Sequence, residues 1–149
     1  MDGLQSSFPH PDDSPGLLLW RVTMAWQARQ RAVLRPHDLT HVQFVLLAGL
    51  VDLGQPVSQA ELARYMGVDA MMTSQVLRVL VSRGLVERHR DEGDARVIRV
   101  EATTAGANLA NAAIDDVEST DRAFFAPLGT DVVAFAACLD AVLRGELAP

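Results

Sequence analysis

The sequence predicts a mainly α-helical protein with one small β-hairpin. Six segments carry apolar residues at helical spacing or a helix-capping signal, whereas only two short segments, near residue 90, have the pattern of strands. The chain has 149 residues, of which 49% are hydrophobic and 21% charged, the composition of an ordinary globular domain with a substantial core. We therefore expect a single domain built from helices.

The N-terminal part is predicted to contain a tail and two helices. Residues 1–15 contain three prolines and scattered Asp and Ser, so we expect a flexible tail. A helix over residues 16–35 carries two tryptophans and is ended by Pro36. A second helix over residues 39–53 has Thr40 as its N-cap and is apolar on most faces, so it should lie centrally in the fold.

The central stretch, residues 58–99, has the element order of a winged helix-turn-helix. Ser58 and Glu61 match a capping box at the start of a short helix, and Gly67 suits the tight corner before a second helix over residues 69–83. Gly84 supplies a left-handed C-cap, after which residues 85–88 and 97–100 read as two strands around an acidic turn, residues 91–94. Such a module places one helix in a DNA groove and braces it with the hairpin.

Two further helices are predicted at the C-terminal end. The first, capped by Thr103 or Thr104, extends to about residue 125; the second, capped by Thr130, extends to about residue 144 and is apolar nearly all round. A small monomer could hardly bury that surface, so we expect the first and last helices of the chain to form a dimer interface. The predicted parts are a flexible tail (1–15), N-terminal dimerisation and support helices (16–57), a winged helix-turn-helix DNA-binding lobe (58–101) and C-terminal dimerisation helices (102–149).

Charge is unevenly distributed along the chain. The net charge of −6 argues at first against a nucleic-acid partner, but residues 58–100 carry +1 and the remainder −7. The sequence contains no lysine, so every fixed positive charge is a guanidinium. Guanidinium groups suit bidentate contacts to phosphate and guanine, although genome composition accounts for the choice equally well.

Several features bear on location and reactivity. The first sixteen residues lack the basic and apolar regions of a secretory signal, and the apolar stretch 132–143 is interrupted by Asp140 and too short to span a bilayer. The single cysteine, Cys138, excludes an internal disulfide and is expected to be an inert buried thiol in the last helix. The sequence therefore predicts a cytoplasmic protein with no membrane partner.

The candidate DNA contacts lie on the second helix of the module and on the hairpin. Thr, Ser and Gln side chains can bond base edges or phosphates, and a Met can contact a thymine methyl group; the alternative is that these are solvated or core positions. In the hairpin, Asp94 is expected to orient a nearby arginine, which leaves Arg96 free to enter a minor groove. The full DNA-binding set is Met71, Thr73, Ser74, Gln75, Arg78, Arg88, Asp94 and Arg96.

Other chemistry has little support in the sequence. His37 and His41 are four residues apart, but Thr40 as N-cap places His37 outside the helix, and there is no clear third ligand, so no metal site or other cofactor is predicted. There is no glycine-rich phosphate loop, no G-x-S-x-G and no convincing Ser/His/Asp arrangement, so we expect no enzymatic activity.

Four motifs together resemble the MarR family of bacterial transcription regulators. They are residues 39–44 (LTHVQF), 84–88 (GLVER), 91–96 (DEGDAR) and 103–106 (TTAG), and the resemblance covers about residues 15–143. Each motif alone is weak, but their order and spacing are specific. The chain departs from the family pattern at Glu92, where the family often has proline, and at Ala102, which replaces a usual leucine. The N-terminal helix also lacks the cysteine of peroxide-sensing members.

The resemblance implies an obligate homodimer with interleaved terminal helices and two DNA-binding lobes. By resemblance, the helix at residues 69–83 enters the major groove, Arg96 reaches the minor groove and Asp94 pairs with an arginine. A two-fold dimer implies double-stranded DNA with a pseudo-palindromic operator as its partner. Family members commonly bind a small aromatic or amphipathic effector in a cleft between the dimer helices and the lobe, and the candidates for this are Trp26, His41 and Phe44.

The function predicted from the sequence is that of a homodimeric, sequence-specific repressor released from DNA by a small-molecule effector. Two alternatives remain open: a ligand- or metal-sensing dimer whose DNA role is secondary, and a winged helix that binds protein instead of DNA.

Overall fold

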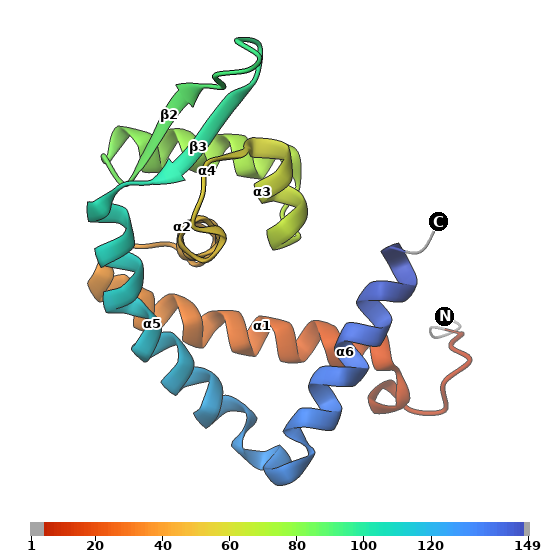
Figure 1. The fold of residues 1–149 in the computed structure, drawn as a ribbon. Helices are drawn as coiled ribbons and strands as arrows, with labels where there is room; N and C mark the ends of the chain where they lie inside the picture. Colours follow the sequence, from red (N-terminus) through yellow and green to blue (C-terminus); the bar gives the residue numbers. More distant parts are fainter. Residues whose placement is uncertain (1–4, 148–149) are drawn as a thin grey trace.

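The computed structural model describes residues 5–147 as a winged lobe carried on an open frame of long helices (Figure 1). The frame consists of α1, α5 and α6, and the β2–β3 hairpin projects from the opposite end of the lobe. The predicted fold class, mainly helical with a small sheet, is confirmed. The elements are η1 (Pro11–Asp13), α1 (Pro15–Leu34), η2 (Arg35–His37), α2 (His41–Leu53), β1 (Val57–Ser58), α3 (Gln59–Met66), α4 (Ala70–Ser82), β2 (Val86–Arg90), β3 (Ile98–Ala102), α5 (Thr104–Phe125), η3 (Ala126–Asp131) and α6 (Val132–Leu147).

Three helices begin at the hydroxyl side chains predicted to cap them. Ser58 Oγ accepts a hydrogen bond from the Glu61 amide (3.2 Å) while Glu61 Oε2 accepts one from the Ser58 amide (2.6 Å), which completes a capping box at α3. Thr40 caps α2 in the same way with Gln43. Thr103, the first of the two predicted alternatives, caps α5. These caps satisfy amides that a helix leaves unpaired at its N-terminus.

The sheet has three antiparallel strands in the order β1-β3-β2. Val57 of β1 pairs with Val100 of β3, and Val86 of β2 pairs with Ala102. The two hairpin strands lie one to two residues further along the chain than predicted. Strand β1 was not predicted, because two residues are too few to show an alternating pattern.

One apolar core joins α2 to the lobe. Its fully buried side chains include leucines from three helices, among them Leu46 and Leu47 of α2, Leu62 of α3 and Leu77 of α4, and the sheet valines Val86 and Val100. A second cluster, which includes Leu34, Phe44 and Val117, joins α2 to α1 and α5. Helix α2 is therefore covered on both sides, which explains why its sequence is apolar on most faces.

Both ends of the described chain depart from the prediction. Residues 11–13 of the predicted tail form η1, and Asp12 within it accepts a hydrogen bond from Arg21 of α1 at 2.7 Å. Residues 1–4 lie outside the described residues. Thr130 does not cap the last helix: it lies in η3, and α6 begins at Val132 and extends to Leu147. The expectation of a buried Cys138 is also wrong for the single chain, in which this residue is exposed.

The C-terminal helices expose a large apolar surface. By length and composition alone, the stretch Thr104–Gly145 is long and apolar enough to cross a membrane, and its most apolar window has a mean hydropathy of 1.6. This stretch is not one straight helix, because Gly129 (φ 52°, ψ −125°) breaks it between α5 and α6. Helix α6 alone has 16 residues and thus spans about 24 Å, less than the roughly 30 Å of a bilayer core.

Gly106 allows α5 to approach the base of the hairpin closely. A Cβ at this position would lie 2.0 Å from the carbonyl oxygen of Leu85, which accepts a hydrogen bond from the Thr103 amide at 3.0 Å. Both sides of this contact are backbone, so neither can move away as a flexible side chain could. Only glycine fits here without displacing α5 or the first strand of the hairpin.

We therefore expect Gly106→Ala to lower the free energy of unfolding by about 3 kcal/mol or more, because the overpacked backbone must shift. Urea unfolding followed by circular dichroism measures this change. Gly16→Ala is the matched control: a Cβ there meets nothing within 4 Å, so this helix substitution should be neutral or stabilising by up to about 1 kcal/mol. Equal unfolding midpoints for Gly106→Ala and the wild type would contradict the assignment.

Candidate nucleic-acid interface

The exposed face of α4 begins directly after its N-cap. Asp69 Oδ1 accepts a hydrogen bond from the Met72 amide at 2.8 Å, which fixes the first turn. Met71, Gln75 and Arg78 follow at spacings of four and three and therefore share one side of the helix. All three are exposed, and Met71 has 72% of its surface accessible. This side presents an apolar, an amide and a guanidinium group to a partner.

Thr73 does not belong to this face, and its prediction as an exposed contact is wrong. The residue is fully buried, and its hydroxyl donates to the Asp69 carbonyl oxygen at 2.9 Å. It lies on the inward side of α4 with Val76, Leu77 and Leu80. The helical spacing of these apolar residues could have shown its orientation. Ser74 is half-buried, and its carbonyl accepts a hydrogen bond from Arg78 Nε at 3.4 Å.

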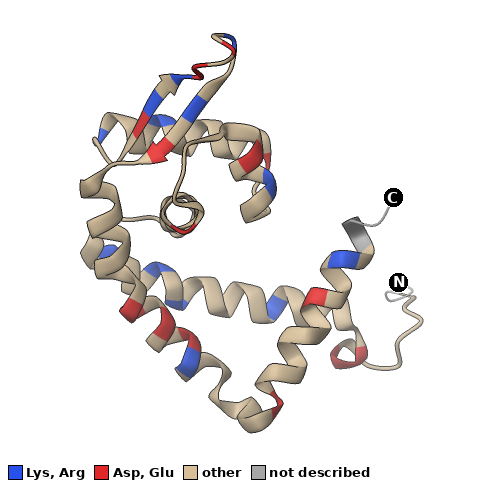
Figure 2. Cartoon of the chain, in the orientation of Figure 1, with Lys and Arg blue, Asp and Glu red and all other residues tan. Residues whose placement is uncertain are grey.

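The β2–β3 hairpin, called the wing below, carries exposed arginines on its strands and tip. Figure 2 shows arginines interleaved with acidic residues on the wing, and further acidic residues along α5. Arg88 and Arg90 on β2 and Arg96 beyond the turn are exposed. Within the described residues, none of the three forms an ion pair closer than 4.0 Å. Their guanidinium groups are thus available to phosphates or bases.

The aspartate that pairs with an arginine in the wing is Asp91, and the prediction of Asp94 in that role is wrong. Asp91 Oδ2 accepts from Arg99 Nε at 2.7 Å, whereas Asp94 Oδ1 accepts from the backbone amide of Arg96 at 3.0 Å. The hydrogen bond from Arg99, assisted by the amides of Gly93 and Asp94, holds the pKa of Asp91 below its ordinary value. Asp91 and Arg99 are eight residues apart in the sequence. They come together only because of the register in which β2 and β3 pair, and the sequence pattern does not reveal that register.

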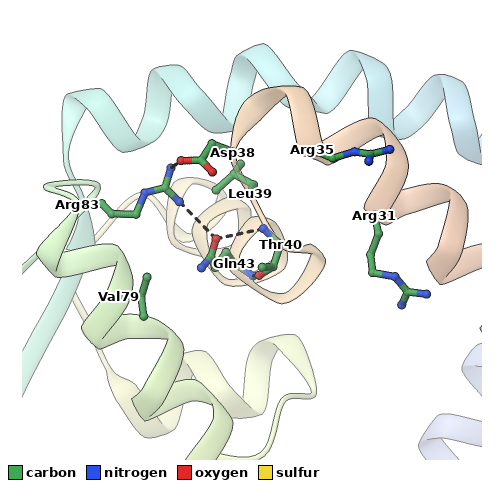
Figure 3. Close-up of a pocket in the computed structure, with 8 residues that line it drawn as sticks. All are labelled: Arg31, Arg35, Asp38, Leu39, Thr40, Gln43, Val79 and Arg83. Carbon is green, nitrogen blue, oxygen red and sulfur yellow. Dashed lines mark hydrogen bonds and ion pairs between the residues drawn. The ribbon is translucent and has the colours of Figure 1, made fainter.

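A cavity of about 490 Å³ lies between the end of α1, the start of α2 and α4 (Figure 3). Arg83, just after α4, donates to Asp38 Oδ2 and to Gln43 Oε1, both at 3.3 Å. Arg31 and Arg35 lie on the other side of Thr40. No motif in the sequence marks these arginines, which become neighbours only when the end of α4 packs near the turn between α1 and α2. The lining residues are Arg31, Arg35, Asp38, Leu39, Thr40, Gln43, Val79 and Arg83.

The three effector candidates from the sequence do not line this cavity. Trp26 Nε1 donates to Asp121 Oδ1 at 2.7 Å, and the Trp26 ring packs edge-on against His41 with 5.0 Å between centroids. Burial lowers the pKa of His41, against the opposing effect of the Asp121 charge. Phe44 is buried, with 5% exposure. These contacts join α1, α2 and α5, so a packing role accounts for all three residues.

His37, the other member of the histidine pair, has a protein partner. Its Nε2 lies 2.7 Å from Asp116 Oδ2 on α5. Among the residues that the structure describes, no group of three or more His, Cys, Asp or Glu side chains could hold a metal ion. The structure therefore directs attention to α4, the wing and the arginine-lined cavity.

Comparisons with known proteins agree with this architecture. A model of the MarR family matches residues 37–97. The HTH-type transcriptional regulator YdcH of Bacillus subtilis (strain 168) is 40% identical over 124 residues, which cover 81% of this chain and 84% of that protein. A MarR mutant from E. coli, solved in complex with operator DNA, superposes with a TM-score of 0.78 at 27% identity, covering 95% of this chain and all of that one.

A second similar structure contains a bound small molecule. CouR from Rhodococcus jostii RHA1, solved with p-coumaroyl-CoA, has a TM-score of 0.81 and 25% identity, and the match covers 95% of this chain and 97% of CouR. Three findings agree: the identity and coverage of the match to YdcH, the match to the family model, and the shared fold. The chain belongs to the MarR family of transcriptional regulators.

Proposed function

We propose that this regulator is a homodimeric repressor that binds a pseudo-palindromic operator and is released from it by a small organic anion. The observation that carries the DNA-binding part is the presence, on one lobe, of an exposed helix face and a wing with unpaired arginines. Met71, Gln75 and Arg78 provide contacts for a major groove, where thymine methyl groups and base edges are accessible. Arg96 provides a guanidinium for the adjacent minor groove.

The small net charge of the lobe suggests that affinity for the operator depends on two lobes binding together. Residues 58–100 carry a net charge of only +1, so non-specific attraction to phosphate should be weak. A dimer that places two lobes on half-sites about one helical turn apart uses both sets of contacts at once. A bound dimer that overlaps a promoter would block transcription, which is the basis of the proposed repression.

Exposed apolar residues on α1 and α6 support the proposed dimer. Trp20 is 62% exposed, Val133 76% and Val142 69%, which is unfavourable for side chains of this size in water. The two helices belong to the same frame (Figure 1). Burial of this surface against a second copy of the chain would also remove the apolar stretch of α6 from solvent.

The arginine-lined cavity is the proposed effector site. Its volume of about 490 Å³ falls in the usual range for small-molecule sites, roughly 300–1,000 Å³. Arg31 and Arg35 would attract an anionic group, and Leu39 and Val79 provide apolar contacts, so the ligand class is an organic anion with an apolar body. The bound p-coumaroyl-CoA of the similar CouR structure is compatible with this chemistry.

The contacts of Arg83 suggest how a ligand in the cavity would affect DNA binding. This side chain links the end of α4 to Asp38 and Gln43 at the start of α2. An anion in the cavity would compete with Asp38 for the guanidinium and so change the position of α4 relative to the frame. A ligand that prefers the altered geometry would shift the population away from the DNA-binding state.

The DNA-binding proposal is tested by selecting a duplex from a random pool and measuring affinity by fluorescence anisotropy. Arg96→Ala should weaken specific binding by about 1–3 kcal/mol, because a guanidinium contact in the groove is lost. Arg122→Ala, at an exposed position on α5, is the control and should bind normally. Unchanged affinity for Arg96→Ala would remove this residue from the interface, and failure of the wild type to bind any duplex at low salt would overturn the DNA-binding function.

The dimer proposal predicts that Val142→Asp yields monomers, because a carboxylate would have to be desolvated in the apolar interface. Light scattering after size-exclusion chromatography gives the mass of each species. Met71→Asp, at an equally exposed apolar position on α4, is the control and should remain dimeric. A monomeric wild type, or a dimeric Val142→Asp variant, would contradict the assigned interface.

The effector proposal predicts that benzoate, an aromatic anion, raises the midpoint of thermal unfolding by a few degrees at saturating concentration, since it binds only the folded state. Benzamide has the same shape without the charge and should have little effect. Arg31→Gln and Arg35→Gln should each reduce the shift, and benzoate should release the operator DNA. Equal shifts with benzoate and benzamide would argue against an anion site.

A further inference from the structure

We propose that Arg99 contributes to DNA recognition without touching DNA, by fixing the wing to the start of α3 through Asp91 and Glu61. This inference rests on the proposed DNA-binding function and adds a positioning residue to it. We call the three side chains the wing clamp. None of them was selected by the sequence analysis as a site residue.

The guanidinium of Arg99 is held from two directions. Its Nε donates to Asp91 Oδ2 at 2.7 Å, and its Nη1 donates to Glu61 Oε2 at 2.9 Å. The Arg99 side chain is only 30% exposed. Since its Nε and Nη1 are engaged by two carboxylates from different elements, Arg99 is well placed to hold the wing in position.

On one side, the clamp organises the tip of the wing. Asp91 Oδ1 accepts hydrogen bonds from the amides of Gly93 (2.8 Å) and Asp94 (3.0 Å), and Asp94 Oδ1 accepts one from the amide of Arg96 (3.0 Å). A continuous series of hydrogen bonds therefore connects Arg99 to the backbone of Arg96. The direction in which the Arg96 side chain leaves the wing depends on this series.

On the other side, the clamp reaches the helix-turn-helix. Glu61 Oε2, which accepts from Arg99, also accepts from the Ser58 amide as part of the capping box of α3. Ser58 itself pairs with Arg99 in the sheet. Helix α3 packs against α4, so the clamp sets the wing relative to the helix that carries Met71 and Gln75.

The guanidinium of Arg99 also influences the ionisation of its two partners. The hydrogen bond from Arg99 is the largest cause that lowers the pKa of Asp91, while hydrogen bonds with Ser58 and the Arg99 charge lower that of Glu61. Both carboxylates therefore remain ionised at neutral pH, and their stabilising effect is lost only in acid, as the pH falls through these lowered values.

A double-mutant cycle on the selected operator tests the proposal. Arg99→Gln and Arg96→Ala should each weaken specific binding by about tenfold, and the double variant should bind about as weakly as either single variant, because Arg99 acts through Arg96. The dependence of affinity on salt should be the same for the double variant as for Arg96→Ala. Arg122→Gln combined with Arg96→Ala is the control pair and should show additive effects.

Hydrogen exchange of the free protein gives a second readout that does not involve DNA. The amides of Asp94 and Arg96 should lose protection in Arg99→Gln and keep it in an Arg96→Ala variant, which leaves the clamp intact. Should Arg99→Gln fail to fold, Asp91→Asn replaces it in the cycle, since the amide oxygen can still accept the hydrogen bonds from Gly93 and Asp94 while the ion pair with Arg99 is lost.

The outcomes separate this inference from the function on which it rests. A wild type that binds no duplex would overturn both. If the wild type binds and Arg96→Ala binds more weakly, but the effects of the two substitutions are additive, the positioning role is wrong while the DNA-binding function stands. A further fall in the salt dependence of the double variant would likewise overturn it, because Arg99 would then contact phosphate directly.

Discussion

The burial of α2 is the interaction on which the rest of the structure depends. Leu46 and Leu47 are fully buried and Leu50 nearly so, and each such side chain contributes about 1.5–3 kcal/mol through removal from water. The lobe packs on one side of this helix and α1 and α5 on the other. The winged lobe and the frame therefore share one helix, and a displacement of the lobe relative to the frame requires α2 to change its packing on one side.

Local signals account for the parts of the fold that the sequence predicted well. Ser58 with Glu61, Thr40 and Thr103 mark helix starts through hydrogen bonds within four residues, and Gly67 marks a left-handed corner, so no tertiary knowledge was needed. Strand β1 and the pairing of Asp91 with Arg99 were missed because both arise from contacts between segments distant in the sequence. Thr130 was wrongly predicted to cap the last helix. Its residue type suits an N-cap, but after the kink at Gly129 it still lies in η3, and α6 begins only at Val132.

The same distinction applies to the candidate site. Met71, Gln75, Arg78 and Arg96 were selected from residue type and position on a motif, and all four are exposed. Thr73 has a suitable side chain but faces inward, where its hydroxyl donates a hydrogen bond to the carbonyl oxygen of Asp69. The cavity arginines and the wing clamp combine residues from two or three elements each, and such combinations become visible only once the elements are assembled in space.

The close contact between Gly106 and Leu85 limits how the lobe can move. Two hydrogen bonds from Thr103 hold the start of α5 to the base of the wing at this contact: its amide donates to the Leu85 carbonyl oxygen and its hydroxyl to the Gly84 carbonyl oxygen. That turn must therefore travel with the lobe as part of the same rigid body. In the proposed dimer, any change in the distance between the two lobes has to be absorbed further along α5, where the helix leaves the lobe, or at the turn between α1 and α2, where Asp38 adopts a left-handed conformation (φ 53°).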